Sequence, residues 1–432
     1  MAGAAAVADR AAGSPAGRFG WWGRVRPWHV ALLGSLMALG IVVARLLVPA
    51  DGDISRFVVA GDNFVDPATV DPPIHVVDDS WGYDGQFFWR LAVDPLAWDL
   101  DRHHHGVIFD SAYRPPRLGY PLLAWGLSAG HAPWVATTLV AVNVLAYGAV
   151  AWLGAIVAGR TVFVAGSAAV GRQTAVAGAA VAGAARKRTP LAGLLVAATP
   201  GLVFALSRDL SDVVALATVL AGIVAVQRGR WGWATGAWTA AVATREQALV
   251  VIAGYALWRL AGLVRDRARP TAADLPWLVP PVVTVALQLL VWARIGKLPI
   301  VAAQESNFTY PFGALGPALG DWLRGDTPAW DHMVPFQFAL AVALVVLAFR
   351  YGRHLLAEGD RWLLVSLGLV TVMAVSFGER VWEGPSDLRQ VLDVLALSWV
   401  VLLATPRRLP PWLVAAAVLV WIGTAATRGY AI

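Results

Sequence analysis

The feature that most constrains the fold is a series of long apolar segments that carry almost no charged residue. Of the 432 residues, 58% are hydrophobic and only 14% are charged, and the charges fall mainly between these segments. A stretch of about 18 or more apolar residues is typical of a helix that crosses a bilayer. The chain is therefore predicted to be an all-α polytopic membrane protein.

The apolar segments predict about 11 transmembrane helices in a single transmembrane domain, 28–427. The expected spans are 28–48, 133–158, 190–206, 210–227, 231–244, 246–264, 276–294, 334–350, 361–378, 388–405 and 410–427. The apolar segment 118–130 is too short for an ordinary crossing, so it is expected to be re-entrant or packed at the interface. Two long outer loops are expected, 49–117 and 295–333, and loops of this length are usually functional.

The distribution of charge predicts the orientation of the chain in a cell membrane. Arginines gather in a tail at 1–27, in an Ala/Gly-rich insertion at 159–189 and in the alternate short loops, whereas most carboxylates fall in the opposite loops. By the positive-inside rule, the N-terminus and the 159–189 insertion are cytoplasmic and the short tail 428–432 lies outside. The pI near 10 thus reflects topology, and no nucleic-acid partner is expected. The chain has no cysteine, which excludes thiolate chemistry and disulfides.

The stretch "GYDGQFFWRLAVDP" (82–95) predicts an amphipathic helix soon after the first span. Phe87 and Phe88 share one face, and Gln86 and Arg90 share the other. Such a helix is expected to lie flat on the outer membrane surface with its apolar face down. Asp84 at its start is either an N-cap or a carboxylate placed next to a lipid-borne substrate.

The order of several short motifs resembles bacterial relatives of the GT-C glycosyltransferases, in the branch related to GPI mannosyltransferases. The motifs are "DGDISRF" (51–57), "GYDGQFFWRLAVDP" (82–95), "AYRPPRLGYPLLAW" (112–125), "PGLVFALSRDLSDVVALA" (200–217) and "TREQALVVIAGYALW" (244–258). The resemblance implies a GT-C-like enzyme that transfers a hexose or pentose from a polyprenyl-phosphate carrier to an envelope glycan, lipid or protein acceptor. It also implies that a first-loop aspartate acts as the base or positions the acceptor, with Asp84 as the best match and Asp53 as the alternative or a helper.

Transfer from a lipid phosphate also needs cations at the outer helix ends, where bidentate arginine suits phosphate oxygens. The candidate substrate-binding residues are Tyr83, Gln86, Arg90, Arg117, Tyr120, Arg245, Glu246 and Arg389, with Arg114 also approaching from the first loop. No metal site is assigned, although some relatives hold a divalent cation with first-loop acids, for which Asp51 and Asp53 match. The tryptophans of the second outer loop, Trp322 and Trp330, suit either an acceptor sugar or an interfacial aromatic belt.

Each of these assignments has a structural alternative. Thr244 and Gln247 form a possible capping box, "SRDLSD" (207–212) is typical of a helix N-terminus, and Arg389 is a possible interfacial cation. The three histidines of "RHHH" (102–105) favour a solvated loop over a metal site. A carrier or lipid flippase, or a non-enzymatic envelope-assembly subunit, remains the competing function. The enzyme interpretation predicts that Asp84, Arg245 and Arg389 meet in one cavity.

Overall fold

The protein is described by a computed structural model that covers residues 25–160, 189–326, 333–382 and 389–428. Most of the predicted N-terminal tail and of the 159–189 insertion, Trp330 and nearly all of the C-terminal tail lie outside these described residues. The described chain is predominantly helical, and its strands are a single short parallel pair, β1 (Ala60–Gly61) and β2 (Val76–Val77).

The first half of the bundle is organised around α4 (Val135–Ala158), which packs against α1 (Pro27–Leu47) and α7 (Asp212–Gln227). Small residues allow α1 and α4 to come close, because a Cβ atom at Gly34 would lie 2.6 Å from that of Ala151. The short helices that join them are η3 (Ala132–Trp134), η4 (Pro190–Gly193), α5 (Leu194–Ala197) and α6 (Pro200–Leu206).

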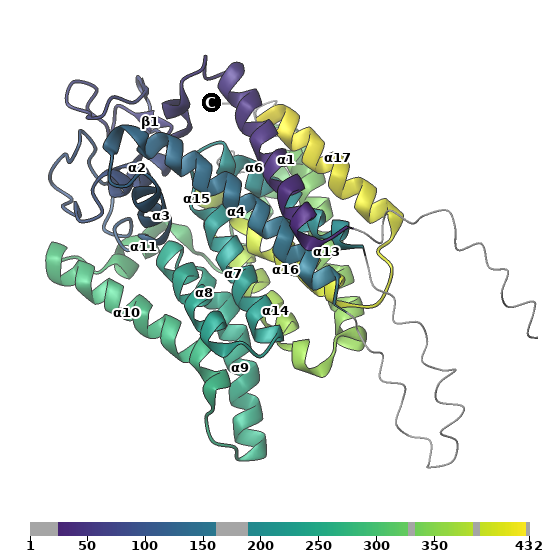
Figure 1. Cartoon of the computed structure of the whole chain (residues 1–432). Coiled ribbons are helices and arrows are strands. Elements are labelled where there is room, and N and C mark those ends of the chain that lie inside the picture. The colour runs from purple at the N-terminus through teal and green to yellow at the C-terminus, as the bar shows by residue number, and fades with distance from the viewer. Residues whose placement is uncertain (1–24, 161–188, 327–332, 383–388, 429–432) are drawn as a thin grey trace, which may run out of the picture.

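The second half adds further helices beside and behind this unit (Figure 1). Helix α8 packs on α7 and α10, α9 packs on α14, and α13 packs on α16. The bounds are α8 (Trp231–Thr244), α9 (Ala248–Asp266), η5 (Ala272–Asp274), α10 (Leu275–Ile295), α11 (Pro299–Asn307), α12 (Leu315–Arg324), α13 (Val334–Leu355), η7 (Glu358–Asp360), α14 (Trp362–Val375), α15 (Glu379–Trp382), η8 (Arg389–Val391), α16 (Leu392–Ala404) and α17 (Pro411–Arg428).

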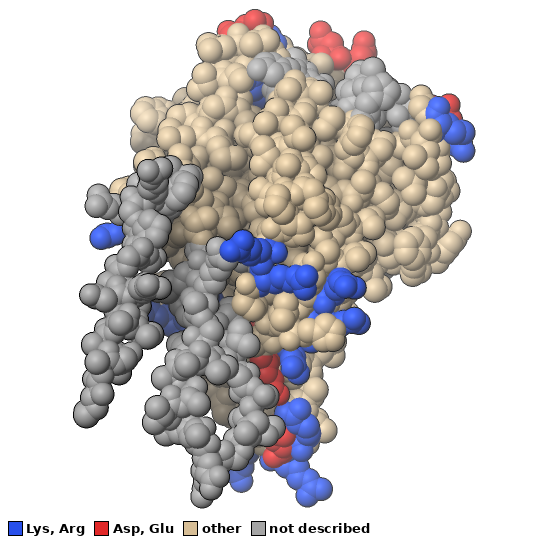
Figure 2. Space-filling model, turned by 90° about the vertical axis from the view of Figure 1, so that its right-hand side faces the viewer, with Lys and Arg blue, Asp and Glu red and all other residues tan. Residues whose placement is uncertain are grey.

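Among the described residues, five helices are long and apolar enough to cross a membrane: α1, η3 with α4, α9, η5 with α10, and α13. Their outer surfaces expose large aliphatic side chains, for example Val282, Leu289 and Leu290 on α10. Figure 2 shows a broad band almost without charged side chains, with Lys and Arg gathered below it. Contiguous exposed apolar surface of this kind indicates contact with lipid, so these features support a membrane protein.

Every predicted span contains helix, but two segments differ from a simple crossing. Residues 190–206 form η4, α5 and α6, with a break at Ala198 and Thr199 just before Pro200. The segment 118–130 contains α3 (Gly119–Leu127), whose nine residues extend only about 14 Å. A bilayer core is about 30 Å thick, so α3 is too short to cross it as a helix.

The helix in "GYDGQFFWRLAVDP" exists as α2 (Gly85–Val93), but the expectation that it lies on the membrane surface is wrong. All residues from Gly85 to Ala92 are buried, on both faces. Helices α3 and α4, the β1 segment and the 95–110 loop surround it, whereas the η2 turn (Ile54–Phe57) packs on α4. The polar face is covered because its side chains bind loop backbone: Arg90 donates to the Val107, Ala97 and Asp99 carbonyl oxygens at 2.7–2.9 Å.

Two glycines set the fit between the first-loop segment and the bundle. A Cβ atom at Gly85 would lie 2.6 Å from the Arg208 carbonyl oxygen, and one at Gly119 would lie 2.1 Å from Thr244 Oγ1. Gly85 follows Asp84, and Thr244 precedes Arg245. The first-loop segment that carries Asp84 therefore packs closely both on the segment after α6 and on the end of α8.

Replacing Gly119 with alanine should destabilise this docking by about 1–3 kcal/mol, because the added methyl group has no room beside Thr244. Gly126 in the same helix is the matched control, since its Cβ would meet nothing within 4 Å. Thermal unfolding in detergent should show a lower midpoint for Gly119→Ala and an equal or higher one for Gly126→Ala. Equal midpoints for both variants would contradict the close contact.

Candidate functional site

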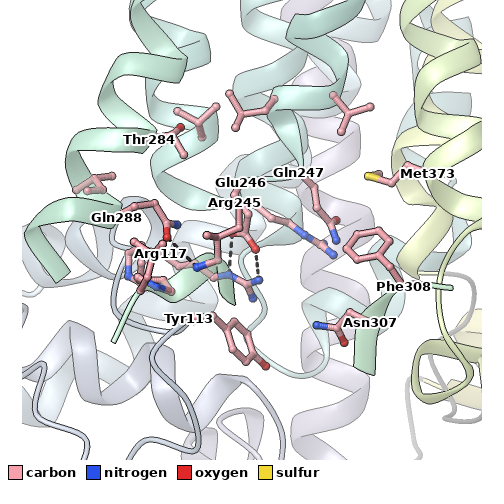
Figure 3. A pocket seen from close by; sticks show the side chains of 18 of the residues that line it. Tyr113, Arg117, Arg245, Glu246, Gln247, Thr284, Gln288, Asn307, Phe308 and Met373 are labelled. Atoms are coloured by element: carbon pink, nitrogen blue, oxygen red, sulfur yellow. Dashed lines mark hydrogen bonds and ion pairs between the residues drawn. The ribbon is translucent and has the colours of Figure 1, made fainter. Parts of the chain in front are cut away.

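One cavity of about 870 Å³ lies where the first-loop segment meets the helix ends. Its wall combines the α2 start, the α8–α9 junction, the faces of α10 and α14, and η8. Figure 3 shows polar side chains at one end and mainly apolar ones around them. The lining residues are Tyr83, Asp84, Tyr113, Pro116, Arg117, Val242, Arg245, Glu246, Gln247, Leu249, Val250, Pro281, Thr284, Val285, Leu287, Gln288, Leu289, Leu298, Pro299, Ile300, Asn307, Phe308, Met373, Phe377, Val381 and Arg389.

Arg389 is the centre of a network of charged side chains beside this cavity. Its Nε atom donates to both Asp212 carboxylate oxygens at 3.0 Å, and its Nη2 atom pairs with Asp84 Oδ2 at 3.3 Å. Its Nη1 atom donates to the Tyr83 hydroxyl at 3.2 Å. Asp212, whose side chain is fully buried, also pairs with Arg245. The network thus joins residues from the first loop, α7, α8 and η8.

Asp84 stands at the N-cap position of α2, but its side chain makes no capping hydrogen bond. Its backbone angles are α-helical (φ −54°, ψ −26°), and its carboxylate is directed toward arginines. Arg114 Nη1 lies 2.7 Å from Asp84 Oδ1, while the other edge of the Arg114 guanidinium binds Asp110 at 2.8 Å. The guanidinium lies over the rings of Phe87 and Tyr113 at 4.5 and 4.3 Å. Arg114 is therefore held rigidly, and it fixes the orientation of Asp84.

The arginines keep Asp84 ionised. Burial alone would raise its pKa, but Arg114, Arg389 and Arg117 outweigh burial and hold the pKa well below the ordinary value of an aspartate. In the absence of substrate, Asp84 is therefore a carboxylate at any physiological pH.

The low pKa of Asp84 predicts how its contribution to stability depends on pH. A carboxyl whose pKa is lower in the folded state stabilises the fold above its unfolded pKa, about 3.9, and loses this effect as the pH falls through the folded value. The difference in unfolding temperature between wild type and Asp84→Asn should thus stay constant from about pH 8 to about pH 5 and shrink only below about pH 4. A difference that shrinks near neutral pH would contradict the depressed pKa.

Asp212 holds two arginines at once, so its loss should cost stability. Replacing it with asparagine leaves Arg245 and Arg389 without their shared, fully buried carboxylate. Breaking a buried ion pair on one side costs about 3 kcal/mol or more. Chemical denaturation should show this decrease for Asp212→Asn, whereas Asp266→Asn, in an exposed pair with Arg265, should leave the free energy of unfolding nearly unchanged. Similar values for the two variants would contradict the central position of Asp212.

A second ion pair, between Arg117 and Glu246, lies in the cavity wall. Two guanidinium nitrogens of Arg117 reach the two Glu246 carboxylate oxygens. Burial acts to raise the pKa of Glu246, but Arg117 outweighs it and lowers the pKa. Tyr113 lies beside this pair, and burial raises its pKa to about 12, so its hydroxyl remains protonated and can donate a hydrogen bond.

The cavity contains six of the ten residues that the sequence nominated, and it brings Asp84, Arg245 and Arg389 together as predicted. The six are Tyr83, Asp84, Arg117, Arg245, Glu246 and Arg389. The other four, Asp53, Gln86, Arg90 and Tyr120, are not among its lining residues.

These four residues have structural partners instead. Gln86 accepts from the Gly61 amide and donates to the Trp81 carbonyl oxygen, and Arg90 holds the loop carbonyls described above. The Tyr120 hydroxyl donates to the Leu139 carbonyl oxygen, within the protein core. Asp53 accepts from the Ser55 amide and caps η2. Direct contact of Gln86, Arg90 or Tyr120 with substrate is therefore not supported.

The structure differs from the sequence expectations at Asp212, Thr244 and Trp322. Asp212 was explained as a typical helix start, and it is indeed the first residue of α7, but its complete burial next to arginines has no signal in the sequence. Thr244 was expected to begin a capping box, whereas it ends α8 and its hydroxyl donates to the Ala240 carbonyl oxygen. Trp322 packs on Trp382 and Phe338 and does not line the cavity.

The described residues contain no cluster of three or more side chains that fits a metal ion. Asp51 Oδ2 lies 3.7 Å from Arg56 Nη2, and the Asp53 carboxylate accepts hydrogen bonds from Ser55 in the η2 cap. His104 pairs with Asp99 at 3.0 Å. The first-loop acids thus do not form a cation site with one another.

Comparison with known proteins does not place the chain in a family. No protein-family model matches it, and no curated protein sequence matches it significantly.

Proposed function

We propose that the protein is a membrane glycosyltransferase of the GT-C type, with about 11 spans. It transfers a sugar from a polyprenyl-phosphate carrier to a cell-envelope acceptor on the outer face of the membrane. The observation that carries the proposal is the convergence of Asp84, Arg245 and Arg389 in one cavity whose remaining wall is mainly apolar. The resemblance of the sequence motifs to this group supports the same proposal.

The cavity suits an amphiphile with an anionic head. Arginines at one end offer planar, bidentate donors for phosphate oxygens. Apolar side chains of α9 and α10, such as Leu249, Val250 and Val285, extend from that end along helices that can cross the bilayer. A prenyl chain placed along these helices would remain in an apolar environment while its phosphate reaches Arg389.

The charge network also explains how Asp84 would become a useful base. A general base works best when its pKa is near the working pH, whereas arginines depress that of Asp84. A donor phosphate that binds Arg389 offsets part of its positive charge and so weakens its effect on the pKa of Asp84. The carboxylate is then a stronger proton acceptor for the acceptor hydroxyl when donor is bound than when it is absent.

The test is a transfer assay in proteoliposomes with a panel of radiolabelled polyprenyl-phosphate sugars and a membrane extract as the acceptor source. With at least one of the sugar donors, radiolabel should appear in a product other than the donor. Empty liposomes should give no such product. Folded protein that moves labelled donor between leaflets without forming product would instead identify a lipid flippase. Folded protein that does neither would contradict the proposal.

A further inference from the structure

The cavity has a second polar wall that the arginine network does not use. It consists of the uncharged side chains of Gln247, Thr284, Gln288 and Asn307. In Figure 3, Gln288 lies on one side of the Arg117–Glu246 pair, and Gln247, Asn307 and the Phe308 ring lie on the other. Amide groups from three different elements thus border the same space.

The position of Gln288 indicates a function, because its helix is otherwise apolar. Helix α10 is largely exposed and can cross a membrane, where polar side chains are rare unless they face a cavity or a partner. Thr284 and Gln288 are four residues apart, so they share one helix face, and both line the cavity. The Gln288 carbonyl oxygen accepts from the Ile300 amide at 2.9 Å, which leaves its two N–H donors and one lone pair for a ligand.

The charges next to this wall are already balanced. Glu246 neutralises Arg117 through two contacts. A charged group bound here would have to break this two-contact pair, whereas hydroxyl groups gain amide donors and acceptors without breaking it. The wall thus favours an uncharged, hydroxyl-rich group over an acidic or cationic one.

The Phe308 ring adds an apolar platform at the edge of the wall. It is about half exposed (51%) and lies 5.4 Å from the Phe377 ring, centroid to centroid. The backbone beside it is anchored to the end of α14, since the Thr309 amide donates to the Ser376 carbonyl oxygen at 2.8 Å. A sugar ring presents an apolar C–H face that can pack on such a ring while its hydroxyls reach the amides.

We propose that this wall is a subsite for a neutral sugar, in which Gln247 and Gln288 bind hydroxyl groups and Phe308 packs on the ring face. The inference rests on the proposed function and narrows its substrate class to uncharged hexoses or pentoses, excluding uronic acids and free amino sugars. The bound sugar comes either from the donor or from the acceptor.

The proposal is tested by a binding measurement that needs no transfer. The measurement is saturation-transfer NMR with nanodisc-embedded protein, with empty nanodiscs as the blank. It should detect binding of methyl mannopyranoside or of another neutral methyl hexoside or pentoside. Methyl glucuronide and methyl glucosaminide should give only weak signals. Gln288→Leu should lower the affinity for the neutral glycoside about three- to tenfold, as expected for one lost hydrogen bond. Gln227→Leu is the matched control, because Gln227 ends α7 at the opposite end from Asp212.

The two sources of the sugar are separated by adding lipid phosphates. If the subsite holds the donor sugar, a farnesyl-phosphate sugar should displace the methyl glycoside and farnesyl phosphate alone should not. If it holds the acceptor sugar, neither should displace it. No neutral-glycoside signal, a preference for the charged sugars, or an unchanged affinity of Gln288→Leu would overturn the subsite. Binding without any transfer would retain the subsite and contradict the proposed enzyme.

Discussion

Replacing Asp84 with asparagine should lower the transfer rate about 10²- to 10⁴-fold, the range expected when a general base is removed. Asparagine retains the shape and a hydrogen-bond acceptor for Arg114, but it cannot accept the proton of an attacking hydroxyl. Asp84 is the first-loop carboxylate that lines the cavity together with Arg245 and Arg389. The rate should be measured at saturating donor, so that a change in donor binding does not mimic the loss of the base.

Asp53→Asn is the matched control for this substitution. Asp53 is the competing aspartate of the same loop, and it caps η2 without lining the cavity. The Asp53→Asn variant should retain a transfer rate within about threefold of wild type, since asparagine caps a helix about as well as aspartate. A loss of transfer in Asp53→Asn with normal transfer in Asp84→Asn would exchange the roles of the two residues.

Replacing Arg389 with glutamine should weaken donor binding about 10²-fold, because charge-assisted hydrogen bonds contribute about 1.5–3 kcal/mol each. Arg389 is the residue that connects Asp84, Asp212 and Tyr83. Arg389→Lys should recover little of the donor affinity, because a single ammonium group cannot bind these partners in the way that the planar guanidinium does. The apparent KM for the lipid-phosphate donor is the quantity to compare, with Arg228→Gln, at the far end of α7, as the control.

The Arg389 result separates a binding role from a structural one. If Arg389 only stabilises the fold, the variant should lose stability while its folded fraction keeps the donor KM of wild type. If it binds phosphate, the donor KM should rise while the acceptor KM changes little. An unchanged donor KM in folded Arg389→Gln protein would contradict its assignment as a phosphate ligand.

The sequence predicted the helical class and the meeting of three distant residues, because both depend on local signals. Apolar segments identify helices, and charged residues mark the ends of those helices. Asp84, Arg245 and Arg389 all lie at helix ends. The periodicity of a sequence does not show whether a loop packs over the polar face of a helix. Gln86 and Arg90 were expected to bind substrate, but both side chains donate hydrogen bonds to loop carbonyl oxygens.

The partners of the charged groups were also beyond prediction. Asp212 is a favourable residue for the start of any helix, and nothing in its neighbours shows that η8, 177 residues later, brings Arg389 to it. The close fit at Gly119 similarly depends on Thr244, in a helix that the chain reaches much later. Tertiary contacts of this kind determine which of several plausible ionisable residues form the site.

We propose that a lipid phosphate occupies the cavity beside Asp84 and Arg389. The most direct test is photolabelling of membrane-embedded protein with a benzophenone-bearing prenyl phosphate, followed by mapping of the labelled peptides. The account predicts labels on α9 and α10, near Leu249 and Val285, that unlabelled farnesyl phosphate competes away and that Arg389→Gln strongly reduces. Labelling that is confined to other helices, or that is unchanged by Arg389→Gln in folded protein, would contradict it.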